Sequence, residues 1–442
     1  MRALCFFLIF LLFASPAFAG INLIRDAEVE NTLKKYAEPV FLAAGLSPDA
    51  INLYIVNDES INAFVAGGQN LFINTGLITQ CTSANMLIGV MAHETGHIAG
   101  GHIVKMSGKA ENLSLEAVLA TVLGAAVTVA GLPDAGIAVL GAGQHLAMRN
   151  FLSFSREQEV EADQYGINFL HSTKQSTQGM LDVMELLRRH QTLDFGAVDP
   201  YAISHPLSQD RISHIRAEAS NEGNIKDDGF GEAHQRMVAK LYGFLENPDY
   251  TFSKYTGDDL ASIYARSIAY YKKPDLAKAL AEVDKLLKMR PNDPFFNELK
   301  GQFLAESGRP QEGLAYYKKA DELYPGNYLL KLELGKLYAS NGNPESAINE
   351  LSKASKLEPQ SSGVWRLLAT SYGAEGNEGM ASLMLAEEAK ILDKKEEAKK
   401  YAKLAQEKLP KNSPALQRAQ DIIADIKIQE KKDDDKSVFL SN

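Results

Sequence analysis

The stretch Met91-Ala92-His93-Glu94-Thr95-Gly96-His97-Ile98 decides how the first half of this chain folds and acts. On a helix, His93 and His97 stand one turn apart on the same face, so both imidazoles can reach one metal ion. Glu94 points from the neighbouring stripe, where its carboxylate can take a proton from a water that the metal activates. The same residues also fit a surface helix with two solvated histidines. Other parts of the chain must separate these two interpretations.

Length and composition restrict the class of protein. The chain has 442 residues, of which 45% are hydrophobic, so we expect about two or three domains with a sizeable core. The formal net charge of -10 argues against nucleic acid as the main partner, because the chain has no excess of cations to neutralise phosphates.

The N-terminus, residues 1–19, reads as a cleavable secretory signal. Arg2 is followed by the apolar run 4–13 and by Ala17-Phe18-Ala19, a small-residue cleavage site. A membrane anchor is the alternative, but the run is shorter than the ~20 residues that span a bilayer. Cleavage would leave Cys81 as the only cysteine, so no disulfide could form within the chain. We therefore predict a bacterial periplasmic protein.

Apolar periodicity and turn residues predict a mostly helical domain with a small sheet over residues 20–225, then a linker with a helix over 226–256. The expected helices are 28–46, 82–101, 156–170, 179–190 and 232–245, and the expected strands are 52–56 and 70–74. Residues 117–148 form an almost uncharged block broken at 133–136. This block predicts a helical hairpin that is either buried in the domain or a lipid-facing or lid-like hairpin over the active site. It is too short to span a bilayer, so we expect membrane contact rather than insertion.

A 34-residue period runs through the C-terminal half. This period and its small residues predict tetratricopeptide repeats over 257–428, four repeats and a capping helix, with a disordered tail at 429–442. The repeated positions are Gly308, Gly342 and Gly376; Pro291, Pro325 and Pro359; and the small residues Ala279, Gly313, Ala347 and Ala381. Such repeats are typical of domains that dock protein partners.

A third metal ligand is sought in Ser155-Arg156-Glu157-Gln158-Glu159-Val160-Glu161-Ala162-Asp163. Glu159 and Asp163 are four residues apart and share a helix face, so one carboxylate can bind a metal while the other braces a ligand histidine. A solvated acidic face is the alternative. Together, the HETGH stretch and this acidic run resemble the M48 family of zinc metallopeptidases. The resemblance implies a zincin-like α+β fold and one Zn²⁺ held by His93, His97 and Glu159. It also implies Glu94 as general base and Asp163 in the supporting position.

A metzincin site would need its third histidine at position 103, which is isoleucine. His102 misses that position by one residue, about 100° around a helix. The segments 62–68 and 74–77 also resemble M48 peptidases, in which an exposed strand beside the metal pairs with the substrate backbone. On this basis we expect Gly67, Gly68, Asn70 and Phe72 to bind substrate, with a plain core strand as the alternative.

Ser204-His205-Pro206-Leu207 followed by Asp210-Arg211-Ile212 resembles a further M48 segment, with Arg211 in a supporting position. Two roles are open for His205. It can hydrogen-bond the oxyanion of the reaction, or it can bind zinc as a fourth ligand and hold the enzyme latent. The latter role is implied by a periplasmic branch of the family that combines a signal, this domain and C-terminal repeats.

The sequence therefore predicts a periplasmic zinc endopeptidase whose repeats dock protein partners. The family resemblance implies substrates and partners among outer-membrane barrel precursors and their assembly machinery, and also a lipopolysaccharide-export barrel. The alternative is a chaperone or assembly factor that works by binding, with the zinc site latent.

Overall fold

The computed structural model describes residues 22–102, 156–193, 201, 204–222, 225 and 229–440. The chain divides into two compact units, residues 1–269 and 270–442. The expected signal at 1–19 and the apolar hairpin at 117–148 lie outside the described residues. Within the described ranges, no helix combines the length and the apolar character that crossing a membrane requires.

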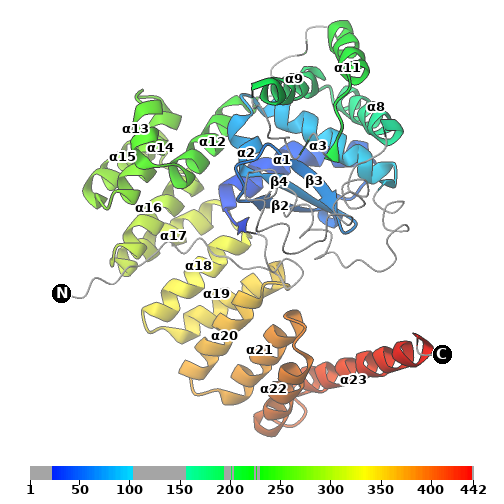
Figure 1. Ribbon diagram of the computed structural model, residues 1–442. Helices are drawn as coiled ribbons and strands as arrows, with labels where there is room; N and C mark the ends of the chain where they lie inside the picture. The colour runs from blue at the N-terminus through cyan, green and yellow to red at the C-terminus, as the bar shows by residue number, and fades with distance from the viewer. Residues whose placement is uncertain are drawn as a thin grey trace. The chain divides into compact units, whose positions relative to one another are not determined.

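The first unit combines helices with a small sheet, as the sequence predicts (Figure 1). Its elements are β1 (Leu23–Ile24), α1 (Ala27–Ala43), the 3-10 helix η2 (Pro48–Ala50), β2 (Asn52–Val56), β3 (Ala63–Ala66), β4 (Asn70–Asn74), α2 (Thr75–Gln80), α3 (Ala84–Ala99), α8 (Arg156–Ser172), α9 (Gln178–Leu193), α11 (Gln209–Asn221), α12 (Gly231–Leu245), α13 (Pro248–Lys254) and α14 (Leu260–Lys272).

The sheet has four strands in the order β1-β2-β4-β3. β2 and β4 run parallel, whereas β1 pairs with β2 and β3 pairs with β4 in antiparallel fashion. Gly67 and Gly68 form the turn between β3 and β4 with positive φ angles of 57° and 94°, which glycine adopts without a steric penalty. β3 therefore lies at one edge of the sheet and β4 in its interior.

Helix α3, which carries the HExxH stretch, lies at the centre of this unit. It contacts β3, α1, α8 and α9, and nearly all of its residues are buried (Figure 1). Two glycines of α3 permit this close packing. A Cβ at Gly96 would lie 2.5 Å from the carbonyl oxygen of Ala162 on α8, and a Cβ at Gly89 would lie 2.6 Å from the backbone nitrogen of Met180 on α9. The packing fixes α3 against both neighbouring helices.

Helix α12 lies within the segment that the sequence assigns to a linker, and it packs on α1 and α2. Its His234 is buried, with Nε2 2.9 Å from the carbonyl oxygen of Cys81. Arg236 Nη2 lies 2.7 Å from Glu28 Oε1 on α1, and Tyr264 of α14 donates a hydrogen bond to Glu28 Oε2. These buried polar contacts, and the apolar face that α12 adds to the core, make it part of the first unit.

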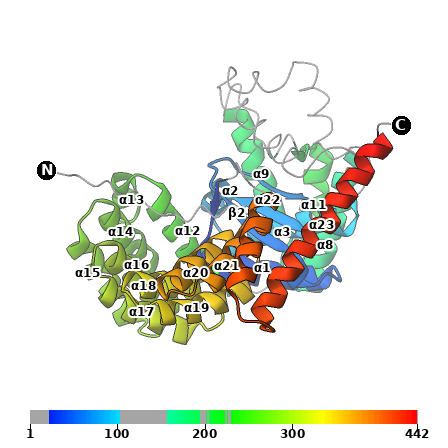
Figure 2. The same ribbon diagram turned by 90° about the horizontal axis from the view of Figure 1, so that it is seen from below.

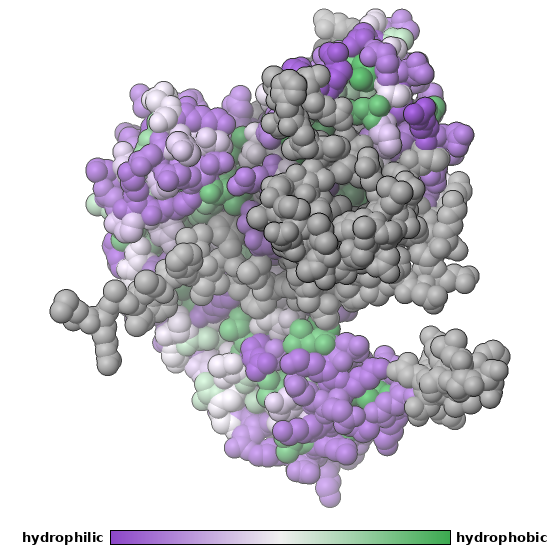
Figure 3. Space-filling view, viewed as in Figure 1, coloured by the Kyte–Doolittle hydropathy of each residue, from purple (hydrophilic) through white to green (hydrophobic). Residues whose placement is uncertain are grey.

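The second unit is entirely helical in its described residues, and α15–α22 follow one another in chain order (Figure 2). Its helices are α15 (Leu276–Met289), α16 (Pro294–Glu306), α17 (Pro310–Leu323), α18 (Tyr328–Ser340), α19 (Pro344–Leu357), α20 (Ser362–Ala374), α21 (Glu378–Ile391), α22 (Lys395–Lys408) and α23 (Pro414–Leu440). The face of this unit seen in Figure 3 is mostly hydrophilic, since most large apolar side chains of the repeats are buried.

The 34-residue period has a direct structural cause. Gly308, Gly342 and Gly376 each end one helix of a pair with a positive φ angle, of 82°, 72° and 77°. The small residue Gly313 lets α16 and α17 approach, because a Cβ there would lie 2.6 Å from the carbonyl oxygen of Gly301. The expected order of a mostly helical domain with a small sheet followed by helical repeats is confirmed.

Helix α23 runs to Leu440 and so reaches into the segment 429–442, which the sequence predicts to be disordered. Lysine, glutamine and glutamate have high helix propensity, and extending an existing helix avoids the cost of nucleation.

Candidate metal centre

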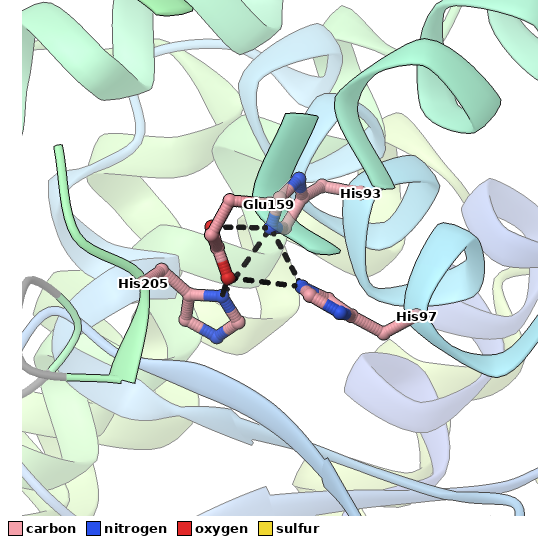
Figure 4. Close-up of side chains that lie close together, drawn as sticks. All are labelled: His93, His97, Glu159 and His205. Carbon is pink, nitrogen blue, oxygen red and sulfur yellow. Dashed lines mark hydrogen bonds and ion pairs between the residues drawn. The ribbon is translucent and has the colours of Figure 1, made fainter. Parts of the chain in front are cut away.

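Four buried side chains from three parts of the first unit converge on one point. His93 and His97 come from consecutive turns of α3, Glu159 comes from the first turn of α8, and His205 comes from the segment that precedes α11. Figure 4 shows their side chains pointing toward one another. Each of these residues is at most 2% exposed, so the site excludes most water.

The spacing of these donor atoms fits a four-coordinate metal ion. Ligand distances of about 2.0–2.2 Å give a tetrahedron with edges of about 3.3–3.6 Å. His93 Nε2 lies 3.1 Å from His97 Nε2 and 3.3 Å from His205 Nδ1. Glu159 Oε1 lies 3.4 Å from His97 Nε2 and 3.1 Å from His205 Nδ1. The four residues therefore stand at ligand spacing, with His205 as one of them.

The charge around the site also fits a divalent cation. Glu94, Glu159 and Asp163 are buried together with a single guanidinium, that of Arg211. In the protonation state that metal binding requires, with neutral histidines and ionised carboxylates, the three carboxylates and one arginine would carry a net charge of -2. Buried charges are stable only when they are paired or bind a metal, and an ion of charge +2 would balance this set.

The ring nitrogen of His93 that faces away from the donor set contacts Asp163, which is itself paired with Arg211. His93 Nδ1 lies 2.8 Å from Asp163 Oδ1, and Arg211 donates two hydrogen bonds to Asp163, at 2.6 and 2.9 Å. Burial lowers the pKa of His93, but the hydrogen bonds and charges of Asp163 and Glu159 outweigh it and raise that pKa to about 10. Without a metal the two carboxylates thus favour a cation at His93. Asp163 and Arg211 occupy the supporting positions that the sequence predicts.

Glu94 faces His205 across the site. Glu94 Oε1 lies 3.3 Å from His205 Nε2, and the carboxylate accepts no hydrogen bond from the described residues. Burial raises the pKa of Glu94 above its ordinary value. A carboxylate with a raised pKa binds a proton more readily, as a general base must.

Two residues that the sequence did not assign to the site also contact it. The ring of Tyr201 stacks on His205 with centroids 4.4 Å apart, and His205 donates its backbone N–H to the Tyr201 carbonyl at 2.7 Å. The only local signal for Tyr201 is its place four residues before His205. His102 lies with its Nδ1 2.9 Å from His97 Nδ1. Glu161, two residues after Glu159 on α8, contacts His102 rather than the ligand set.

Two residues of the predicted substrate-binding set, Asn70 and Phe72, lie on an interior strand. β4 is paired on both sides, with β2 and β3, so Asn70 and Phe72 have no free backbone edge to offer a substrate. Phe72 is fully buried, and Asn70 donates its side-chain amide to the carbonyl of Gly67 at 3.0 Å. Strand order is decided by long-range pairing, which the local pattern of β4 does not encode. Among the described strands, β3 is the edge beside α3.

Comparison with known proteins agrees with this geometry. The model of peptidase family M48 matches residues 24–219, and two tetratricopeptide models match residues 264–328 and 304–370. The M48 match contains all four convergent residues together with Glu94, Asp163 and Arg211.

Several curated proteins are similar over part of the chain. The beta-barrel assembly-enhancing protease of Yersinia pestis is 24% identical over 292 residues, which are 64% of this chain and 59% of that protein. The metalloprotease LoiP of Escherichia coli (strain K12) is 29% identical over 182 residues, 41% of this chain and 68% of that protein. The solved tetratricopeptide protein YrrB aligns with a TM-score of 0.33 at 17% identity, over 38% of this chain and 91% of that one.

The chain matches less than two thirds of the length of the assembly-enhancing proteases. Within the chain, however, the M48 match coincides with the sheet, the HExxH helix and the buried donor set, and the repeat matches coincide with paired helices. Residues 24–219 therefore form a metallopeptidase domain of family M48, which the chain joins to C-terminal tetratricopeptide repeats.

Proposed function

We propose that this protein is a periplasmic zinc-dependent endopeptidase, held latent by His205, whose repeats dock protein partners. The observation that carries the proposal is the convergence of one ligand atom from each of His93, His97, Glu159 and His205, all buried and within 4.8 Å of one another. Imidazole and carboxylate ligands in a closed tetrahedral set favour zinc over magnesium or calcium, which prefer oxygen ligands in larger number.

Each residue has a distinct part in the proposed reaction. His93, His97 and Glu159 would hold the ion, which supplies a Lewis acid that polarises the scissile carbonyl and lowers the pKa of a water. Glu94 would take the proton of the attacking water and pass it to the leaving amine. Asp163 orients His93 and is itself held by Arg211, so these two residues keep the ligand geometry fixed.

His205 fits the role of a plug better than that of an oxyanion donor. A catalytic zinc site has three protein ligands and leaves its fourth position to water or substrate. His205 Nδ1 lies 3.1 Å from Glu159 Oε1 and 3.3 Å from His93 Nε2, a spacing that fits two ligands of the same ion. Its Nε2 faces the carboxylate of Glu94. The side chain thus occupies the space that the attacking water needs. An oxyanion donor would stand beside the ligand set rather than within it.

The proposed substrate and partners rest on the edge strand, the repeats and the name of a relative. The four residues of the edge strand β3 beside α3 are buried, and once uncovered this strand could pair with an extended polypeptide, because an edge strand can hydrogen-bond to an added strand. The repeats imply protein partners. The name of the Yersinia pestis relative points to beta-barrel assembly, so we place the substrates and partners among barrel precursors and their assembly machinery, as the family resemblance also implies.

A second candidate function follows from the same position of His205. If the plug never leaves, the protein is an assembly factor or chaperone that acts by binding, with a zinc site that stabilises the fold. The two candidates differ in whether peptide-bond cleavage is needed in the cell.

Substitution of Glu94 tests the enzyme. We expect Glu94→Gln to abolish cleavage of an unfolded barrel precursor, because the loss of a general base typically costs about 10²–10⁴-fold in rate. Zinc content and partner binding should stay unchanged. Full complementation of a deletion strain by Glu94→Gln would instead favour the binding function.

Substitution of His205 tests the plug. His205→Ala should raise the cleavage rate if His205 closes the site, and lower it if His205 stabilises the oxyanion. The matched control is His214→Ala, at an exposed histidine on α11, which should leave the rate unchanged. Cleavage by His205→Ala that disappears in the double variant with Glu94→Gln would assign the activity to this site.

A further inference from the structure

A fully buried histidine outside the donor set contacts one of its members. His102 is 0% exposed, and its Nδ1 lies 2.9 Å from Nδ1 of His97, the nitrogen that faces away from the other donors. The opposite nitrogen, His102 Nε2, lies 3.1 Å from Glu161 Oε2. The side chain of Glu161 is 47% exposed. The successive contacts from His97 to His102 and from His102 to Glu161 therefore connect the buried centre with the surface.

The chain is shaped to bring His102 back toward α3. Gly101 has a φ angle of +64°, a conformation that turns the backbone at the end of the helix and that glycine adopts most easily. Gly100 leaves room for the ring, because a Cβ there would lie 2.6 Å from His102 Nε2. The two glycines of the sequence Ala99-Gly100-Gly101-His102 thus permit a contact that a continuing helix would not make.

Hydrogen-bond chemistry gives this contact a direction. The ionised Glu161 carboxylate can only accept, so His102 donates from Nε2. A neutral His102 then has its lone pair at Nδ1, where it can accept the proton carried by His97 Nδ1. That arrangement leaves the lone pair of His97 on Nε2, which is the atom 3.1 Å from His93 Nε2 and 3.4 Å from Glu159 Oε1.

We propose that His102, backed by Glu161, is the positioning residue for His97: it fixes the tautomer and the ring orientation in which His97 can bind the metal. The inference rests on the proposed zinc site. It gives each ligand histidine of α3 its own support, since His93 has the buried Asp163 and Arg211 and His97 has a second imidazole followed by a surface carboxylate.

The expected effect is on metal affinity, before any effect on turnover. Removing a partner that orients a metal ligand typically costs about 10–100-fold in affinity. His102→Phe keeps an aromatic ring and removes both nitrogens, so we expect a loss in this range. His102→Asn retains an acceptor near the former Nδ1 and should recover part of the affinity. Glu161→Ala should cause a smaller loss in the same direction.

The experiment measures Zn²⁺ affinity of the full chain by competition with a chromophoric chelator, and the absorption spectrum of the Co²⁺-substituted protein, which reports coordination geometry. Glu157→Ala is the matched control, because Glu157 is an exposed acid one turn earlier on α8. We expect the affinity and spectrum of this control to equal those of the wild type, and those of His102→Phe and Glu161→Ala to differ from them.

Zn²⁺ affinities of His102→Phe and Glu161→Ala within error of the wild type, with an unchanged Co²⁺ spectrum, would overturn the inference. If His102→Phe fails to fold, Glu161→Ala decides, since its position is half exposed. Wild-type protein that binds neither ion would overturn the zinc site as well as this inference. Wild-type binding with unchanged variants would overturn the inference alone.

Discussion

At the scale of single residues, Gly96 ties the HExxH helix to the helix that supplies the carboxylate. It stands between Glu94 and His97 on α3, and Ala162, its neighbour on α8, lies between Glu159 and Asp163. A Cβ on Gly96 would meet backbone atoms of Ala162, at 2.5 Å from its oxygen and 3.0 Å from its Cα. Backbone cannot rotate away as a side chain can, so a larger residue must push the two helices apart.

We therefore expect Gly96→Ala to lower both stability and metal affinity. Overpacking of this kind typically costs about 1–3 kcal/mol, and moving α8 displaces Glu159 and Asp163 together. The measurements are the denaturation midpoint and Zn²⁺ affinity. Gly373→Ala is the control, because a Cβ added to Gly373 on α20 would meet no neighbouring atom within 4 Å. It should be neutral or stabilising by up to about 1 kcal/mol. A stable Gly96→Ala protein with wild-type affinity would contradict this account.

Residue spacing could predict part of the candidate site and not the rest. The four-residue periods of His93 with His97 and of Glu159 with Asp163 place each pair on one helix face, and the structure brings both faces together. That Glu159 rather than Glu157 or Glu161 joins the donors came from the family resemblance. The contact of His102 depends on the backbone reversal at Gly101. Neither the direction of that reversal nor the stacking of Tyr201 follows from local periodicity.

At the scale of elements, three helices meet in a buried ionic cluster that the sequence did not predict. Glu28 of α1 accepts from Tyr264 of α14 and pairs with Arg236 of α12, while Lys240 of α12 lies 2.8 Å from Asp26. All but Asp26 are at most 9% exposed. The cluster joins residues more than 200 positions apart, and such pairing is not visible in any local window of sequence. The order of the strands in the sheet cannot be predicted from local sequence for the same reason, whereas the sequence predicts β2 and β4 with their observed bounds.

Tyr264→Phe isolates one hydrogen bond of this cluster. We expect the first unit to lose about 1.5–3 kcal/mol of unfolding free energy, the usual range for a hydrogen bond to a charged group. Equilibrium denaturation would measure it. Tyr250→Phe is the control, because Tyr250 on α13 is 64% exposed and should change stability by less than about 0.5 kcal/mol. Equal midpoints for the two variants would show that the hydrogen bond from Tyr264 to Glu28 contributes no net stability.

At the scale of the whole molecule, the proposed metal site lies in the first of the two compact units, residues 1–269. Metal bound at about 1,000 times its dissociation constant stabilises a fold by about 4 kcal/mol. We expect a chelator to lower the midpoint temperature of the first unit's calorimetric transition and to leave that of the repeat unit unchanged. Added Zn²⁺ should restore the lowered midpoint. If chelation lowers neither midpoint, or lowers both equally, the metal does not stabilise the first unit alone and this expectation is wrong.

If His205 acts as the proposed plug, the contacts of its segment determine what fraction of the molecules has an open metal site. That segment is held by Arg211, which donates to the carbonyl of Pro206 at 2.9 Å, and by the stacking of Tyr201. If these contacts favour the closed form by ~3 kcal/mol, roughly 1% of molecules are open at any moment. A partner that binds the open form about 100-fold more tightly would bring the two forms near parity. The free energy of these contacts would thus set how much more tightly a partner must bind the open form than the closed form before cleavage begins.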